Sequence, residues 1–286
     1  MLVTHKRIVI LALATVMLVL LSSPRRLEAD DPGLAPLQEL LSSEIEAYPG
    51  RVAIAVTDLQ TGESISLNGD RWQYAGCTIN AFTLWTVGLV YQDTGKLAPY
   101  IHLYNVATVS WAPANTALVF WLGDGDVYRG LERINQALQE YDFGVFYDHP
   151  PGYDGYSLGN RENYITANQM NRFWTGLHNR QMIGPEAAAW AFDLFKLVGP
   201  KYNTIIPARL PSRARVFHKV GFFYYVSGVS AQNDSGIVVY DDGEKAFAYA
   251  ITFLSEPLTI SEYFWENEAF GAKLSRMVFD NFYERY

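Results

Sequence analysis

The chain has 286 residues, of which 49% are hydrophobic and 15% aromatic, and it carries a formal net charge of −8. This composition excludes a disordered chain and is sufficient for one large domain with an extensive core. The acidic balance argues against nucleic acid and anionic lipid surfaces as partners.

The first segment is basic and then apolar. Lys6 and Arg7 precede a continuous run of apolar or small residues from Ile8 to Leu21. The run is shorter than the roughly 20 residues of a spanning helix, which favours a signal peptide over residues 1–29; a short uncleaved membrane anchor is the alternative. Either interpretation predicts a secreted or extracytoplasmic protein that meets a membrane only through this segment. Cleavage near Ala29 would leave 18 basic and 29 acidic residues, a net charge of −11.

The cysteine and histidine content gives no sign of a disulfide or a metal site. Cys77 is the only cysteine, so no intramolecular disulfide can form. The five histidines are scattered without the spacing of metal ligands. We therefore expect neither a metal nor another cofactor.

Helix and strand patterns follow one another in an order that suggests two lobes. Residues 34–47 carry leucines and isoleucine at helical spacing, and residues 51–59 and 63–68 form a predicted hairpin. The next predicted helices are 81–91, 116–122, 128–140, 166–179 and 185–197. Strand patterns return over 215–225, 235–240 and 245–253, and Ser261 is the predicted cap of a last helix.

These elements predict an α+β fold with a five-stranded antiparallel sheet flanked by the terminal helices, together with an all-helical lobe. Within one domain, 30–286, the sheet lobe would contain residues 34–72 and 205–286, and the helical lobe residues 73–204. A site is expected between the lobes. Residues 141–164 are rich in Gly, Pro, Asp and Tyr, and a loop of this length is often functional.

The stretch from Tyr74 to Asn80 has the pattern of a sharp turn between a strand and a helix. Gly76 permits the turn, and Cys77 is expected in the first turn of the helix, where free N–H groups favour negative charge. Asn80 follows one turn later on the same face. A cysteine at such a position is either a small buried residue or a reactive thiol.

Several stretches resemble the class A β-lactamases and their penicillin-recognising relatives, from about Leu34 to the C-terminus. Cys77-Thr78-Ile79-Asn80 stands where the family has S-x-x-K, Pro113-Ala114-Asn115 where it has S-D-N, and His218-Lys219-Val220-Gly221 where it has K-T-G. Thr166-Ala167 and the strand from Asp234 to Val238 resemble further family segments. The resemblance implies the family's fold.

The resemblance also implies a chemistry that this chain has altered. In the family a serine attacks a lactam or peptide carbonyl, and a lysine, or a glutamate through water, removes its proton. Here the serine position is Cys77 and the lysine position is Asn80, whose amide cannot accept a proton near neutral pH. The alignment places Pro113 at the second serine. Lys219 is retained, either as a partly exposed strand lysine or as part of an anion subsite.

The glutamate of the family's omega loop has no clear counterpart. Glu162 stands too close to Thr166 for the family's spacing, whereas Asp148 and Asp154 are nearer to it. No acid is therefore assigned.

We predict an exported, monomeric β-lactamase-like protein that is catalytically inactive and binds a small-molecule, peptidoglycan-like or protein ligand. The expected catalytic positions are Cys77, Asn80, Asn115 and Lys219, and the expected binding residues are Val220, Gly221 and Phe222. One alternative is an acyl-transfer hydrolase with the Cys77 thiolate as nucleophile and backbone N–H groups as oxyanion hole. Another is an interaction domain whose cleft is closed by the aromatic residues after Gly221.

Overall fold

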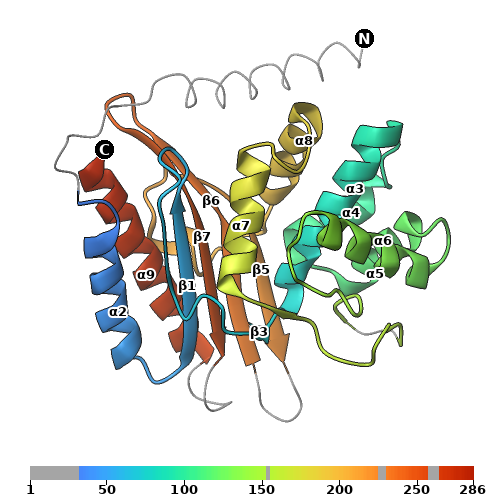
Figure 1. The fold of residues 1–286 in the computed structure, drawn as a ribbon, viewed down its shortest axis with the longest axis horizontal. Coiled ribbons are helices and arrows are strands. Elements are labelled where there is room, and N and C mark those ends of the chain that lie inside the picture. The colour runs from blue at the N-terminus through green and yellow to red at the C-terminus, as the bar shows by residue number, and fades with distance from the viewer. Residues whose placement is uncertain (1–31, 153–154, 225–229, 257–263) are drawn as a thin grey trace.

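The centre of the molecule is a five-stranded antiparallel sheet in the order β2-β1-β7-β6-β5 (Figure 1). This computed structural model describes residues 32–152, 155–224, 230–256 and 264–286. The strands are β1 (Arg51–Asp58), β2 (Ser64–Leu67), β5 (Arg215–Tyr224), β6 (Ser230–Asp241) and β7 (Ala246–Glu256). β1 pairs with β7 along its whole length, which joins the N-terminal hairpin to the C-terminal strands. The predicted α+β fold is confirmed.

Helices cover both faces of the sheet. α2 (Ala35–Ala47) and α9 (Phe264–Arg285) lie on one face, and α7 (Ala167–His178) packs on the other against β1, β6 and β7 (Figure 1). Because side chains alternate between the faces of a sheet, each face has its own core. The core beneath α9 contains Tyr249 and Phe282, whereas the core toward the helical lobe contains Phe82, Trp85 and Phe173.

The helical lobe surrounds α3 (Asn80–Thr94), most of whose residues are buried. The other helices of this lobe are α4 (Tyr100–Val109), α5 (Ala112–Leu122), α6 (Val127–Glu140) and α8 (Pro185–Phe195), followed by short 3-10 turns at Pro200–Tyr202 and Pro207–Arg209. A short ladder pairs β3 (Gln73–Tyr74) with β4 (Tyr164–Ile165). This ladder ties the end of the long loop to the segment that precedes Cys77.

The observed elements depart from the sequence-based prediction in several places, three of which follow. Helix α4 was not predicted, because its exposed face carries Tyr100, Ile101 and Tyr104 and therefore has no amphipathic pattern. Helix α5 begins at Ala112 rather than residue 116, since a proline in the first turn loses no helical hydrogen bond. Strand β6 begins five residues earlier than expected. The N-terminal segment 1–29 and the expected cap Ser261 lie outside the described residues.

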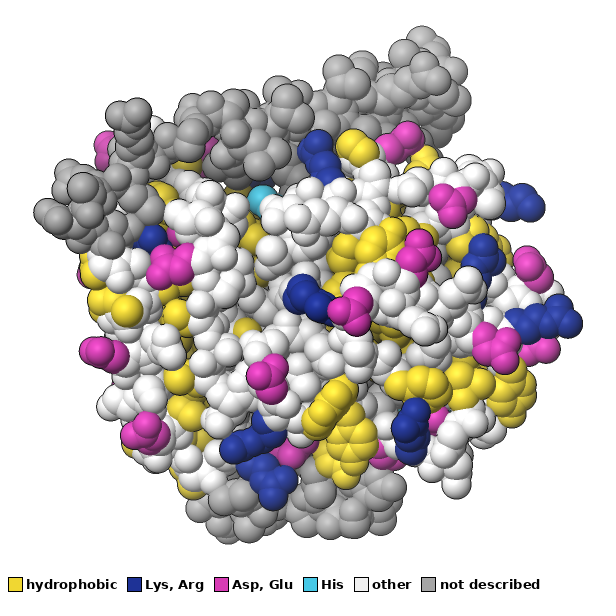
Figure 2. All heavy atoms as spheres, in the orientation of Figure 1, with side chains coloured by type: hydrophobic (Ala, Val, Ile, Leu, Met, Phe, Trp, Pro, Cys, Tyr) yellow, Lys and Arg dark blue, Asp and Glu magenta, His cyan; other side chains and the backbone are white. Residues whose placement is uncertain are grey.

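The surface of the helical lobe is unusually apolar. Tyr100, Ile101, Trp111 and Phe120 are all at least half exposed, and Figure 2 shows hydrophobic side chains reaching the surface mainly over this half of the molecule. Of the helices that the structure describes, none combines the length and apolar character needed to cross a membrane.

Candidate functional site

Cys77 lies in a 3-10 turn, η1 (Gly76–Ile79), that leads directly into α3. Gly76 has a φ of 51°, in the left-handed region that favours glycine, so the predicted sharp turn is confirmed. Asn80 is the first residue of α3, and its backbone N–H donates to the carbonyl of Cys77. The expectation that Cys77 itself lies in the first α-helical turn is wrong, because that turn has 3-10 geometry.

Strand β5 lies directly against η1 because Gly221 has no side chain. A Cβ at this position would lie 2.1 Å from the Oγ1 atom of Thr78 and 2.3 Å from its backbone nitrogen. Opposite Gly221 on β6, Asn233 donates its side-chain N–H to the carbonyls of Tyr74 (2.7 Å) and Ala75 (3.2 Å). These contacts hold Cys77 next to the middle of β5.

A hydroxyl from the turn between α4 and α5 completes this cluster. Ser110 ends α4 with a φ of 52°, and its Oγ accepts a hydrogen bond from the ammonium of Lys219. Lys219 Nζ also donates to the carbonyl of Val220 at 3.0 Å. The Ser110 hydroxyl is also close enough to the thiol of Cys77 to favour its charged form. Cys77, Ser110 and Lys219 therefore form one connected chain of polar groups.

The structure places Ser110, and not Pro113, beside Lys219. Pro113 lies within the first turn of α5, whereas Ser110, three residues earlier, presents its hydroxyl to Lys219. The sequence alignment missed Ser110 because helix α4, which positions it, was not predicted. The signal that could have found it was a serine immediately before a proline-initiated helix.

Burial determines the protonation of the cluster. Lys219 has no exposed surface, so its interpretation as a partly exposed strand lysine is wrong. Burial lowers the pKa of its amine to about 8, although the nearby Cys77 and Asp234 raise it. Burial likewise raises the pKa of the Cys77 thiol above its ordinary value, and Lys219 and Ser110 oppose this shift with a smaller effect. The thiol is thus protonated at neutral pH, despite its position before a helix.

The lowered pKa of Lys219 predicts a specific dependence of stability on pH. The folded protein holds fewer protons at this amine than the unfolded chain between about pH 8 and the ordinary value of 10.5, so stability rises with pH across that window. We expect the advantage of Lys219→Met over the lysine-bearing protein to shrink by about 3 kcal/mol between pH 7 and pH 10.5. Urea unfolding of both proteins, each also carrying Cys77→Ala to remove the thiol, measures this difference. A difference that stays constant with pH would contradict the assignment.

Two buried asparagines and a tyrosine adjoin the cluster. Asn80 has no exposed surface, and neither atom of its amide has a hydrogen-bond partner among the described residues. Asn115 donates to the hydroxyl of Tyr147 at 2.9 Å, and the same hydroxyl lies 3.0 Å from the Oγ1 atom of Thr83. Burial raises the pKa of Tyr147, and the proximity of Cys77 raises it further. Sequence analysis missed Tyr147 because no periodic pattern distinguishes a side chain within the long loop.

Only part of the predicted binding segment faces the cluster. Side chains alternate along β5, so Lys219 and Gly221 face η1, whereas Val220 and Phe222 point toward the opposite face. Phe222 packs against the core beneath α9, and its ring centre lies 6.0 Å from that of Tyr202. The structure therefore does not bring the side chains of Val220 and Phe222 to Cys77.

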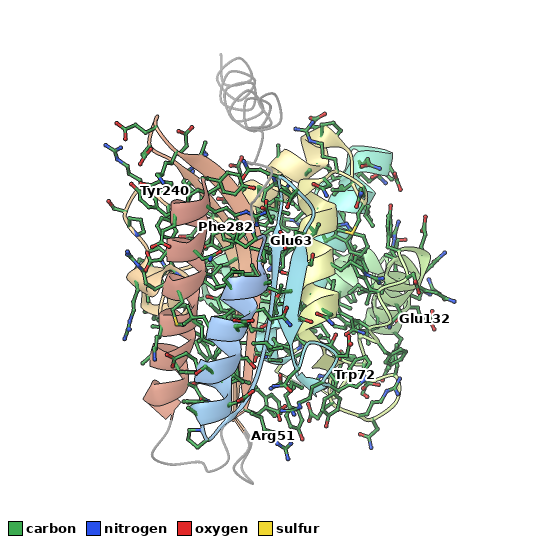
Figure 3. The ribbon with its side chains drawn as sticks, turned by 60° about the vertical axis from the view of Figure 1, so that its left-hand side comes forward. Arg51, Glu63, Trp72, Glu132, Tyr240 and Phe282 are labelled. Carbon is green, nitrogen blue, oxygen red and sulfur yellow. The ribbon has the colours of Figure 1, made fainter. Side chains whose placement is uncertain are left out.

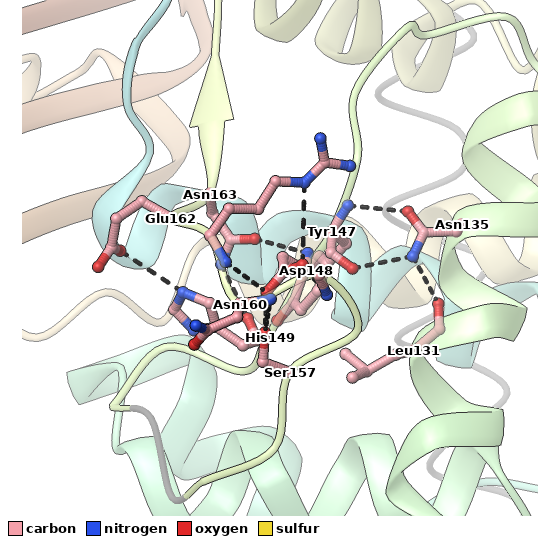
Figure 4. Close-up of polar contacts among 11 residues, drawn as sticks. Leu131, Asn135, Tyr147, Asp148, His149, Ser157, Asn160, Glu162 and Asn163 are labelled. Atoms are coloured by element: carbon pink, nitrogen blue, oxygen red, sulfur yellow. Dashed lines mark hydrogen bonds and ion pairs between the residues drawn. The ribbon is translucent and has the colours of Figure 1, made fainter.

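The acids of the long loop hold the loop itself together (Figure 4). Asp148 is fully buried and accepts hydrogen bonds from the Ser157 hydroxyl and, at 2.6 Å, from the Gly159 N–H. Glu162 lies 3.5 Å from the Nε2 atom of His149. These contacts give both carboxylates a structural role, while Asp154 lies outside the described residues.

The cluster can donate hydrogen bonds more readily than it can accept protons. Lys219 and Ser110 offer donors suited to a carbonyl or carboxylate group, while Asn80 occupies the position from which a base would serve Cys77. In the described part of the chain, no three His, Cys, Asp or Glu side chains are grouped so that they could hold a metal ion.

Comparisons with known proteins agree on the architecture. A family model described as the β-lactamase enzyme family matches residues 125–282, more than half of the chain. No curated protein sequence gives a significant match.

The similar solved structures cover nearly all of the described chain. A mutant of the class A β-lactamase of the last common ancestor of Gram-negative bacteria superposes with a TM-score of 0.70 at 19% identity, covering 87% of this chain and 100% of that one. The structure of PBP-A superposes with a TM-score of 0.71 at 18% identity, covering 88% of this chain and 97% of that one. The chromosome-encoded β-lactamase of Vibrio parahaemolyticus superposes with a TM-score of 0.67 at 16% identity, covering 86% of this chain and 98% of that one. At these identities the similarity shows the fold, and function has to be argued from the site.

Proposed function

The protein belongs to the β-lactamase enzyme family, and we propose that it is an exported, non-hydrolytic member that binds a peptidoglycan-like ligand at the site around Cys77, Ser110 and Lys219. Export is supported by the basic and then apolar N-terminal segment. The ligand class is supported by the family and by the donor groups of the site. A peptide ending in a carboxylate would offer the acceptor that Lys219 and Ser110 can bind.

The observation that carries the proposal is Asn80. It stands one turn after Cys77, it is fully buried, and its amide cannot take up a proton near neutral pH. Groups that act together in nucleophilic catalysis lose most of their effect when one of them is removed. A protein without a base at this position is therefore expected to bind without turnover.

The state of the thiol supports the same conclusion. The thiolate, not the thiol, is the nucleophile, and burial raises the pKa of Cys77. Lys219 could accept a proton through Ser110 only as a neutral amine, which predominates above pH 8. Hydrolysis at Cys77 would thus require both groups to leave the protonation states that they hold at neutral pH.

We expect the purified protein to hydrolyse no chromogenic cephalosporin above background at pH 7 or at pH 9. The higher pH is included because it would reveal a role of neutral Lys219 as a base. Absorbance measurements with wild type and Cys77→Ala test this expectation. Turnover by wild type that Cys77→Ala abolishes would overturn the proposal and establish acyl transfer at Cys77 instead.

Binding is tested separately by titration calorimetry with an acetylated peptide that ends in D-alanyl-D-alanine. The expected result is saturable binding to wild type and weaker binding to Lys219→Met, which removes the buried donor. Val220→Ala is the matched control, since it changes the neighbouring side chain on the opposite face of β5. Equal binding by all three proteins would show that the peptide binds elsewhere.

A further inference from the structure

A pocket apart from the Cys77 site lies between the β3–β4 ladder and the long loop. Its volume is about 420 Å³, and it is lined by Trp72, Gly144, Phe146, Arg161, Glu162 and Tyr164. This volume falls within the range of small-molecule sites. Figure 3 shows Trp72 beyond the lower end of α7, outside the core of the sheet. None of these six residues belongs to the polar chain of Cys77, Ser110 and Lys219.

Three aromatic side chains of this pocket are each more than a third exposed to solvent. Trp72 is 53% exposed, Phe146 38% and Tyr164 37%. Large aromatic side chains are usually well buried, and exposed groups of them commonly mark binding sites. Gly144 also lines the pocket and contributes no side chain to it.

Two of the three rings, Tyr164 and Phe146, are held in place by neighbouring side chains. The Tyr164 ring centre lies 4.9 Å from that of Tyr74, which stacks on Phe223 at 5.0 Å. The guanidinium of Arg161 lies 4.1 Å from the centre of the Phe146 ring. A fixed aromatic surface loses little conformational entropy on binding, which favours affinity.

The charged groups of the pocket indicate a neutral ligand. Arg161 and Glu162 carry opposite charges, so the lining has no net charge. Arg161 also lies 3.8 Å from the buried Asp148. Glu162 lies 3.5 Å from His149 (Figure 4). Neither an anion nor a cation is thus favoured, while guanidinium donors and carboxylate acceptors can both meet hydroxyl or amide groups.

A ligand that suits this lining needs an apolar face and a rim of uncharged hydrogen-bonding groups. A pyranose ring has both, because its C–H bonds form a flat apolar face and its hydroxyls point outward. We propose that this pocket binds a neutral oligosaccharide, with one sugar ring stacked on Trp72 and its substituents bonded to Arg161 and Glu162. The proposal goes beyond the function of the Cys77 site and stands whether or not that site turns over a substrate.

Calorimetric titration with triacetylchitotriose, and in parallel with cellotriose, tests the proposal on the purified protein. We expect saturable binding of at least one trisaccharide below about 10 mM. Trp72→Ala should weaken this binding at least about tenfold, and Trp72→Phe, which keeps an aromatic face, should weaken it less. Glu162→Gln, which removes the charge but keeps the size of the side chain, should also weaken it.

Two controls separate the pocket from the rest of the molecule. Phe120→Ala removes an aromatic side chain that is 51% exposed but lies in α5, away from this pocket, and it should leave binding unchanged. Cys77→Ala should also retain binding, which distinguishes a failure here from a failure of the proposed peptide site. The proposal would be overturned if the protein bound neither sugar. It would also be overturned if Trp72→Ala bound as tightly as wild type with an unchanged melting temperature. A loss of binding with Cys77→Ala alone would place the sugar at the other site.

Discussion

The double variant Cys77→Ser with Asn80→Lys is expected to form a covalent adduct with a reactive penicillin, whereas the wild-type protein is not. The change supplies an alcohol at the nucleophile position and an amine one helical turn later. Because Asn80 is fully buried, an amine introduced there has a lowered pKa and can act as a base. General-base assistance is typically worth about 10²- to 10⁴-fold.

The position of Ser110 strengthens this expectation. Its hydroxyl already contacts both Cys77 and Lys219, so a group that can pass a proton onward is in place without further substitution. The nucleophile and its base are therefore the two parts that acylation still lacks. Acylation should be slow but observable, and release of the adduct slower still, since no loop acid contacts this cluster within the described residues.

Intact-protein mass after incubation with a penicillin measures the outcome, with each single variant as a control. Cys77→Ser alone should acylate far more slowly than the double variant, and Asn80→Lys alone should not acylate. Circular dichroism and thermal melting establish that each protein is folded. A folded double variant that gains no adduct would show that the site is closed to the antibiotic. An adduct on wild-type Cys77 would contradict the assignment of a protonated, unreactive thiol.

Much of the fold could be predicted because most of its strands and helices have a periodic pattern of apolar residues within their own sequence. The alternating apolar residues of β1, β2 and β7 mark strands, and the stripes of α2, α6 and α7 mark helices. Helix α4 could not be predicted in this way. Its apolar residues lie on both its buried and its exposed faces, so its sequence shows no apolar stripe that would indicate a helix.

Site residues that lie within one short stretch of sequence could be named in advance. Those that reach the site only through the packing of distant elements were missed. Cys77 with Asn80, and Lys219 with Gly221, were each expected from a short stretch that resembles a family motif. Ser110 depends on the left-handed end of α4, and Tyr147 on the path of a long loop, neither of which leaves a periodic signal. The sequence left both interpretations of Cys77 open for a related reason: the helix end is visible in the sequence, but the burial that raises the pKa of the thiol is not.

Gly221→Ala is expected to be the most disruptive single substitution at the site, with a loss of at least about 3 kcal/mol in the free energy of unfolding. The added methyl group would meet the Oγ1 and backbone nitrogen of Thr78 at 2.1 and 2.3 Å, and the carbonyl of Ala75 at 2.7 Å. Such contacts are far shorter than van der Waals separation, so β5 and η1 must move apart.

That movement is opposed on both sides, which is why a large effect is expected. Asn233 holds the carbonyl of Ala75 to β6, and β6 is paired with β5 from Arg215 to Tyr224. The strand cannot shift alone without breaking this ladder or the contact between Lys219 and Ser110. Thermal unfolding should show a melting temperature lower by roughly 10 °C. Gly62→Ala is the matched control: its φ of 80° strains an alanine, but no atom lies within 4 Å of the added methyl group, so it should cost only about 1 kcal/mol. If Gly221→Ala were no more destabilising than Gly62→Ala, the close packing of β5 on the Cys77 turn would not be what holds this site together.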